Sequence, residues 1–199
     1  MDRDIFENAW RQFSSYLDNA ERVIIGFSGG VDSTVLAYSC FKILPNLKNK
    51  IVLLHVNHGL NINSDGWENH CKKVADFFGL EIIIEKIESS PAAGVSIEAW
   101  ARRERYSIFQ QYATSKKDVL LCAQHLDDQA ETFLLNILRG AGVRGMRAMP
   151  KVRSLGDALF IRPFLEVTKD SIKNYANAYK LEWIEDDSNL DDKFDRNFL

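Results

Sequence analysis

The sequence has few cysteines and no apolar stretch long enough to cross a membrane. Its three cysteines are Cys40, Cys71 and Cys122, which lie far apart without a Cys-x-x-Cys pair. This spacing argues against a disulfide framework, a zinc ribbon or a cysteine-held iron–sulfur cluster, and it favours buried thiols in a reducing compartment. The amino-terminal residues include acids but no apolar segment, so we expect no secretory signal. We therefore expect a soluble cytoplasmic protein with no membrane partner.

An excess of positive charge is also absent, because the 199 residues have a formal net charge of −3. The overall balance therefore predicts no nucleic-acid partner, although a local stretch can still bind one. Residues 139–153 form such a stretch, with five basic side chains and no acid. In isolation it is typical of a solvated loop, whereas beside a reaction site it would suit an RNA backbone. The five residues are Arg139, Arg144, Arg147, Lys151 and Arg153.

Short apolar runs alternate with amphipathic stretches along the chain. The runs predict strands at 23–27, 51–56, 82–87, 119–123 and 159–161. Helices are expected near 33–44, 65–79, 97–115, 128–139 and 169–179, after a first helix carrying Phe6, Trp10, Phe13 and Leu17 on one face. Strands that alternate with helices predict an α/β fold, a doubly wound five-stranded parallel sheet with helices on both faces. We expect one domain over residues 1–199.

Two further details follow from this pattern. Ser64, Ser96 and Thr168 stand where helix N-caps are expected. Four glycines make the region from Gly140 to Asp157 the least regular, and we expect a loop there.

Polar residues follow three of the predicted strands, at the point where each strand ends. They are the stretches 28–33 (SGGVDS), 55–58 (HVNH) and 124–128 (QHLDD). Parallel α/β sheets bind ligands beyond the carboxyl ends of their strands. The sequence therefore predicts one ligand site along that edge.

The stretch 28–33 joins a strand to a helix through two glycines. Such a turn brings backbone N–H groups and a helix N-terminus to one point, which favours an anion such as phosphate. A carboxylate at Asp32 would repel phosphate unless a cation lay between them, so this interpretation also predicts Mg²⁺ at Asp32. The alternative is a glycine turn whose helix is capped by Asp32 or Ser33. The predicted phosphate-binding residues are Ser28, Gly29, Gly30, Val31, Asp32 and Ser33, with His55 and His58 nearby.

Three acids begin the helix expected after the fourth strand. Asp127, Asp128 and Glu131 are spaced so that Glu131 shares a face with both aspartates. Acids in a first turn can simply cap the helix or offset its dipole. Following a strand end that carries His125, the cluster favours a functional role. Histidines at these strand ends more often hold phosphate or orient a carboxylate than bind a metal.

The sequence "SGGVDS" resembles the pyrophosphate loop of the N-type ATP pyrophosphatases, which cleave ATP between its α and β phosphates. The stretches "HVNHGL" (55–60), "EAWARRERY" (98–106), "QHLDDQAETFLLNILRGAGVRGMRAM" (124–149), "IRPFL" (161–165) and "DDSNLDDKFDRN" (186–197) follow in order. Together they resemble the tRNA(Ile)-lysidine synthetase family over nearly the whole chain. This family ligates lysine to C2 of the first cytidine of the CAU anticodon.

The resemblance implies an adenine-nucleotide alpha-hydrolase-like fold, with ATP and Mg²⁺ as cofactors and tRNA(Ile) and free lysine as partners. It implies that Arg102 and Arg105 neutralise the α-phosphate and the leaving AMP. Asp127, Asp128 and Glu131 would hold the lysine ammonium and then accept its proton, or one of them would instead hold Mg²⁺, and the sequence does not divide these roles. Family members carry further tRNA-binding regions that we expect this chain to lack. Whether it forms a homodimer stays open.

Three alternatives compete with this interpretation. A tRNA thiolase of the 2-thiocytidine type would use the same adenylation, but it needs a cysteine carrier or cluster. An amidotransferase-type synthetase would need a glutaminase domain, for which the chain has no room. A non-catalytic nucleotide-binding module would not need the cluster of Asp127, Asp128 and Glu131.

Overall fold

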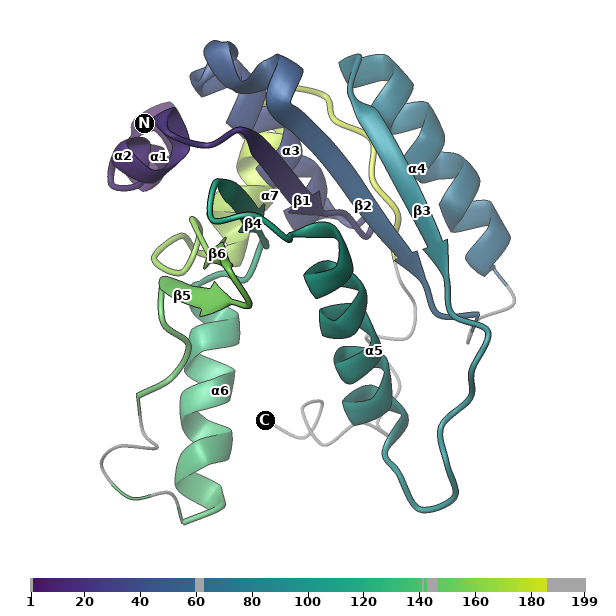
Figure 1. Ribbon diagram of the computed structural model, residues 1–199. Helices are drawn as coiled ribbons and strands as arrows, with labels where there is room; N and C mark the ends of the chain where they lie inside the picture. The colour runs from purple at the N-terminus through teal and green to yellow at the C-terminus, as the bar shows by residue number, and fades with distance from the viewer. Residues whose placement is uncertain (1, 60–62, 141, 143–146, 186–199) are drawn as a thin grey trace.

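The computed structural model describes residues 2–59, 63–140, 142 and 147–185 (Figure 1). Helices and strands alternate through most of this length, as the periodicity predicts. The elements in chain order are α1 (Asp2–Arg11), α2 (Ser14–Asp18), β1 (Arg22–Gly26), α3 (Val31–Ile43), the 3₁₀ helix η1 (Pro45–Lys50), β2 (Ile51–Asn57), α4 (Ser64–Phe78), β3 (Glu81–Lys86), α5 (Ile97–Tyr112), β4 (Asp118–Leu121), α6 (Leu126–Leu138), β5 (Val152–Leu155), β6 (Ala158–Ile161) and α7 (Lys169–Ala178).

The strands form one sheet in the order β3-β2-β1-β4-β6-β5. All neighbouring pairs are parallel except β5 and β6, which are antiparallel. The order reverses between β1 and β4, because the chain builds outward from β1 to β3 and then returns to the other side of β1. A crevice at such a switch point is where open α/β sheets bind ligands. Whatever follows β1 and β4 is therefore brought to the same place.

The prediction of five parallel strands is confirmed, but the sheet has a sixth strand, and the loop expected over 140–157 was wrong in part. Val152–Leu155 forms β5 and pairs with β6 through a hairpin whose two loop residues are Gly156 and Asp157. Gly156 has φ +60°, a conformation that glycine adopts without strain. A two-residue Gly-Asp connection between short apolar runs is a hairpin signal that the sequence does contain.

Apolar side chains alternate between the two faces of the sheet and build two cores. Val23 and Ile25 of β1 point into the larger core, where residues of α1, α3, α4 and α7 cover the sheet. Ile24, between them, joins the smaller core, which α5 covers through Phe109 and Ala113. Helices therefore cover both faces, as predicted. In Figure 1, α6 instead runs away from the sheet on the side where the parallel strands end.

Helix boundaries differ from the predictions in two places. The first amphipathic stretch is two helices, because the chain turns at Phe13, although Phe6, Trp10 and Leu17 are all buried as expected. Ser64 begins α4, and Asn63 holds the N-cap position that we assigned to Ser64. The predicted caps at Ser96 and Thr168 are confirmed, since each side chain accepts a hydrogen bond from a first-turn N–H. Within the described part of the chain, no helix has the length and apolar composition needed to span a bilayer.

Candidate active site

Hydrogen bonds of its two serines stabilise the turn at 28–33. The Ser33 hydroxyl donates to the Gly30 carbonyl at 3.1 Å and accepts from the Ser28 N–H at 3.2 Å. Gly30 is the N-cap of α3, and no side chain caps this helix end. The predicted alternative, a cap formed by Asp32 or Ser33, is therefore wrong. An uncapped N-terminus directs its first-turn N–H groups and its positive dipole end outward, as an anion site requires.

Gly29 is the most constrained residue of this turn. Its φ is +84°, and a Cβ built there would lie 2.9 Å from both Cys71 Sγ and Ile184 Cδ1. Its carbonyl accepts a hydrogen bond of 2.9 Å from the N–H of Ile184, beyond the end of α7. Only glycine fits both the conformation and the space. The turn is thus shaped by distant parts of the chain as well as by its own sequence.

Asp32 meets a lysine that the sequence analysis did not single out. The Nζ atom of Lys169 lies 2.8 Å from Oδ1 and 2.6 Å from Oδ2 of Asp32, so the ammonium contacts both carboxylate oxygens. The two side chains are 33% and 28% exposed, so this ion pair is only partly screened by water. Because β6 lies beside β4, the helix that follows β6 reaches the turn that follows β1.

His125 lies among the three aspartates of the site. Its Nε2 is 3.7 Å from Asp32 Oδ1 and 3.5 Å from Asp128 Oδ2, and its Nδ1 is 3.5 Å from Asp127 Oδ2. The imidazole is buried, whereas Asp127 is exposed. These separations are ion-pair distances, and that a strand-end histidine orients carboxylates stays a prediction. The sheet therefore brings Asp32, Asp127 and Asp128 together around one ring.

The N-termini of α6 and α7 are joined by hydrogen bonds. The Leu126 N–H donates to the Val167 carbonyl, and the Asp127 carboxylate accepts from the Lys169 N–H, both at 2.9 Å. Asp128 caps its own helix by accepting from the His125 N–H at 2.8 Å. Asp128 thus caps its own helix, as an acid in a first turn can, whereas Asp127 binds the first residue of α7, whose N-cap is Thr168. Glu131, one turn later, is half-buried.

The two histidines predicted beside the phosphates lie in different surroundings. His55 is buried, with Nδ1 2.9 Å from the Phe27 carbonyl, so it supports the end of β1 rather than facing outward. His58 packs edge-on against Trp100, and its Nε2 lies 3.5 Å from Arg105 Nη2. Burial, with the neighbouring Arg105 and His55, lowers the pKa of His58 to about 4. This imidazole is therefore neutral at physiological pH.

Arg102 and Arg105 have different partners, although both are exposed on α5. Arg105 lies beside His58, whereas the guanidinium of Arg102 stacks on the Tyr106 ring at 5.0 Å. Trp100, on the same helix, is a core residue that is only 2% exposed. Arg105 and His58 thus form a second polar cluster on the α5 side.

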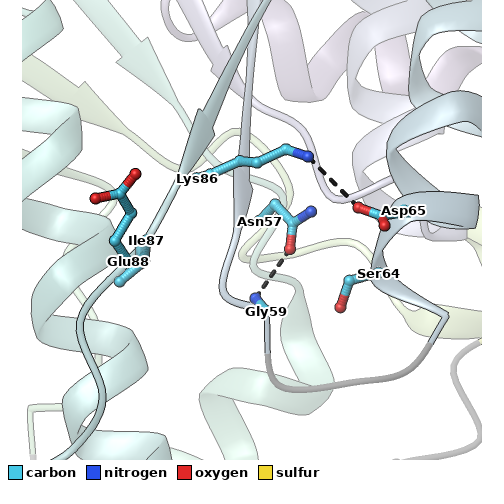
Figure 2. Close-up of a pocket in the computed structure, with 7 residues that line it drawn as sticks. All are labelled: Asn57, Gly59, Ser64, Asp65, Lys86, Ile87 and Glu88. Atoms are coloured by element: carbon cyan, nitrogen blue, oxygen red, sulfur yellow. Dashed lines mark hydrogen bonds and ion pairs between the residues drawn. The ribbon is translucent and has the colours of Figure 1, made fainter.

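A hollow of about 310 Å³ opens at the carboxyl ends of β2 and β3. Figure 2 shows Lys86 of β3 reaching across it to Asp65 of α4, at 3.4 Å, while Asn57 accepts from the Gly59 N–H at 2.9 Å. Lys86 also forms an ion pair with Glu68. The ammonium groups of Lys72 and Lys86 lower the pKa of Glu68 to about 2. These contacts brace the rim of the hollow. The remaining residues lining it are Ser64, Ile87 and Glu88.

The basic stretch 139–153 is divided by the fold. Lys151 forms an ion pair of 2.7 Å with Glu166, and Arg153 stacks on the Phe160 ring at 4.7 Å, so both are tied into the domain. Arg139 and Arg147 are exposed. Arg144 and the whole "DDSNLDDKFDRN" stretch (186–197) lie outside the described residues.

The donor set suits a magnesium ion that binds together with phosphates. No group of three histidine, cysteine, aspartate or glutamate side chains within the described ranges is arranged to hold a metal. Mg²⁺ does not need one, since it is commonly bound through one or two carboxylates, water and substrate phosphates. Asp32, in the first turn of α3, is a carboxylate of that kind.

The three cysteines are buried and unpaired by disulfides, as predicted. Burial raises the pKa of Cys71 to about 12 and that of Cys122 to about 11, and raises that of Cys40 as well. These thiols are protonated at neutral pH, whereas the thiolate is the nucleophile and the metal ligand. They are unsuited to carrying sulfur or holding a cluster.

Comparison with known proteins identifies this architecture. The model of the PP-loop domain, an ATP-binding family, matches residues 3–199. The chain belongs to the PP-loop domain family. The stretch 28–33, which opens α3 beside the acids of α6, is the part of the sequence that resembles a pyrophosphate loop.

The relatives of this PP-loop domain confirm the resemblance drawn from its motifs. It is 44% identical over 188 residues to the tRNA(Ile)-lysidine synthase of Coxiella burnetii, which covers 94% of this chain and 42% of that protein. It is 46% identical over 180 residues to the tRNA(Ile)-lysidine synthase of Pseudomonas aeruginosa, which covers 88% of this chain and 39% of that protein. The chain thus spans less than half the length of these curated relatives.

A solved structure supports the fold. The U34-tRNA thiolase NcsA from Methanococcus maripaludis, solved with its [4Fe-4S] cluster, superposes with a TM-score of 0.72 at 20% identity, over 91% of this chain and 66% of that one. The fold is therefore that of the PP-loop proteins, as predicted.

Proposed function

We propose that this PP-loop domain is the catalytic domain of a tRNA(Ile)-lysidine synthase, a ligase that uses ATP to join lysine to C2 of the first anticodon cytidine. The observation that carries the proposal is the meeting of Asp32, after β1, with Asp127 and Asp128, after β4, around His125. A phosphate site and an acidic site then lie close enough to serve one reaction. The sequence identity to lysidine synthases over most of the chain supports the choice of reaction.

The uncapped N-terminus of α3 would bind the β and γ phosphates of ATP through backbone N–H groups, with the Ser28 and Ser33 hydroxyls beside them. Asp32 would hold Mg²⁺, which would offset the negative charge of the phosphates. The cytidine C2 oxygen would attack the α-phosphate, and pyrophosphate would leave. Arg105 and Arg102 on α5 would then stabilise the charge on the α-phosphate.

Lysine would enter on the α6 side. Its ammonium has a pKa near 10.4, so it arrives charged and must lose a proton before it can attack C2. Asp127, Asp128 and Glu131 are the carboxylates that would bind the ammonium and take the proton. AMP would leave with the former C2 oxygen. The exposed Arg139 and Arg147 follow α6 and would contact the tRNA backbone.

The thiolase alternative is less well supported. Sulfur transfer needs a thiolate or a cysteine-held cluster, whereas Cys40, Cys71 and Cys122 are buried with raised pKa values. A nucleotide-binding module without catalysis would need Asp127 and Asp128 only for their hydrogen bonds at the starts of α6 and α7. We therefore favour ligation in the cytoplasm, where tRNA is modified.

The deciding experiment is a rapid-quench assay with ATP labelled in its α-phosphate, tRNA(Ile) bearing the CAU anticodon, and no lysine. We expect AMP-linked tRNA to accumulate and to disappear when lysine is added. Pyrophosphate release should require tRNA but not lysine. AMP attached to the carboxylate of lysine, formed without tRNA, would contradict the proposal.

The tRNA contact has its own test. Replacing Arg144 and Arg147 with alanine should raise the KM for tRNA and flatten its salt dependence, because fewer phosphates are neutralised. The control is the double variant Lys151→Arg, Arg153→Lys. It keeps both positive charges, at the two positions that contact Glu166 and Phe160. Unchanged tRNA kinetics in the Arg144 and Arg147 variant would favour a solvated loop.

A further inference from the structure

Lys169 connects the two halves of the site through two different groups. Its side-chain ammonium contacts both oxygens of Asp32 in the PP-loop, at 2.8 and 2.6 Å. Its backbone N–H donates to the Asp127 carboxylate at 2.9 Å. Its backbone is therefore held at the start of α7, while its side chain occupies the carboxylate that the proposed function gives to Mg²⁺.

We propose that the Lys169 ammonium and a divalent cation compete for Asp32, so that the PP-loop takes up its metal together with a nucleotide and not alone. The inference rests on the proposed role of Asp32 in metal binding. It adds a positioning residue to the site, one that controls when the metal ligand becomes available.

The geometry makes the two cations mutually exclusive. Mg²⁺ binds carboxylate oxygens at about 2.1 Å, so an ion on either oxygen of Asp32 would lie within a few ångströms of an ammonium that contacts both. Two cations at that separation repel each other strongly in a partly buried site. Lys169 has to leave Asp32 before the metal can bind.

The surroundings allow the side chain to leave. Lys169 is 33% exposed, and its flexible stem extends from a helix whose N-cap, Thr168, is satisfied by its own hydrogen bond to the Ser171 N–H. Movement of the ammonium therefore leaves α7 and its contact with Asp127 intact. Nucleotide phosphates would supply both the remaining metal ligands and a new anionic partner for the displaced ammonium. Metal alone supplies neither.

The test is Mn²⁺ binding, measured by electron paramagnetic resonance on the protein without nucleotide. Lys169→Met removes the charge and keeps the length of the side chain, and it should bind Mn²⁺ about tenfold more tightly than the wild type, since solvent screens part of the repulsion. Lys169→Arg keeps the charge and should bind as weakly as the wild type. Lys173→Met, one turn along the exposed side of α7, is the matched control and should change nothing. Adding Asp32→Asn to Lys169→Met should abolish the gain.

Equal Mn²⁺ affinity in the wild type and in Lys169→Met would overturn the proposal, as would a gain that survives Asp32→Asn. If the methionine variant does not fold, the wild type gives the answer through acetylation with acetic anhydride, read by mass spectrometry. Mn²⁺ at concentrations high enough to outcompete the ammonium should raise the labelling of Lys169 severalfold relative to Lys173, and unchanged labelling would overturn the proposal. Neither readout uses tRNA or the free amino acid lysine. A failure of the ligation assay can therefore be distinguished from a failure of this inference.

Discussion

Helices α3 and α6 both begin at the candidate active site, yet they are held in opposite ways. Eight of the thirteen side chains of α3 are buried, among them Val35 and Leu36. Not one of the thirteen side chains of α6 is buried, although all lie in the described part of the chain. Phe133 and Leu134 of α6 are 41% and 44% exposed. One helix is fixed along its length by the core, and the other is not.

Several hydrogen bonds hold the start of α6. Leu126 and Asp127 bind residues at the beginning of α7, and Gln129 forms two hydrogen bonds with the backbone of Met149, at 2.6 and 2.7 Å. Regions with few buried apolar contacts open at lower free energy than the core does. The side of the site at α3, the phosphate side, is therefore rigid because the core fixes it. The side at α6, the acidic side, is held by hydrogen bonds that single substitutions can remove.

Asp32→Ala should have the largest effect, because it removes a charge from the rigid side. We expect tRNA-dependent pyrophosphate release to fall at least a hundredfold, since the variant loses the carboxylate proposed to hold Mg²⁺ against the phosphates. Circular dichroism should show an unchanged fold, because Asp32 is partly exposed and lies outside the core. Undiminished pyrophosphate release would remove Asp32 from the metal site.

Matched leucine deletions on the two helices test the comparison directly. Leu36→Ala in α3 empties a fully buried position and should lower the free energy of unfolding by about 3 kcal/mol. Leu134→Ala in α6, the same chemical change at a position that is 44% exposed, should lower it by less than about 1 kcal/mol. Urea denaturation of both variants gives the two values. Equal losses would mean that a further part of the protein packs on α6.

Acid should lower the free energy of unfolding through His58, which follows β2. Its pKa is about 4 in the folded protein and about 6.5 in the unfolded chain. Between these values the unfolded chain binds a proton that the folded state does not, so the free energy of unfolding falls as the pH drops from 6.5 to 4. Discounted for solvent exposure, we expect a loss of about 1–2 kcal/mol.

His58→Gln is the comparison variant, because its side chain does not titrate. Its stability should be flatter over the same pH range in urea titrations. A slope equal to that of the wild type would assign the acid sensitivity to other groups, such as the buried His55, whose pKa is also lowered.

Asp127→Ala should have the smallest effect on stability. It removes the acceptor for the Lys169 N–H at the start of α7, and loss of such a contact at a helix end costs about 1 kcal/mol. Asp127→Asn, which keeps an acceptor oxygen, should recover most of that stability. Thermal unfolding of the two variants separates the structural role of Asp127 from its proposed role toward lysine, because the asparagine variant should stay impaired in ligation.

The five parallel strands and the edge that carries the site could be predicted because buried parallel strands are almost continuous apolar runs. Val23–Phe27 and Val119–Ala123 have no polar residue, and the polar stretches after them lie beside one another. The strand β5 was missed because it is short, lies at the sheet edge and follows a glycine-rich stretch. Its Gly-Asp hairpin was the available signal.

The partners within the site could not be predicted in the same way. Lys169 is an ordinary helix-start residue in the sequence, and only the placement of β6 beside β4 brings it to Asp32. His55 lies within β2 and His58 follows it; the first is directed toward the Phe27 carbonyl, whereas the second lies beside Arg105. Distances between side chains on separate strands depend on strand order, which spacing along the chain does not encode.

The hydrogen bond from the Ile184 N–H to the Gly29 carbonyl also has a consequence for how the protein is made. The two residues are 184 − 29 = 155 positions apart, so the contact closes a very long loop. Contacts of such high sequence separation form late, after the local helices and neighbouring strand pairs. During synthesis, β1 and α3 leave the ribosome long before residue 184 does. A nascent chain therefore holds the whole 28–33 sequence before the residue that bonds to its Gly29 carbonyl has been made.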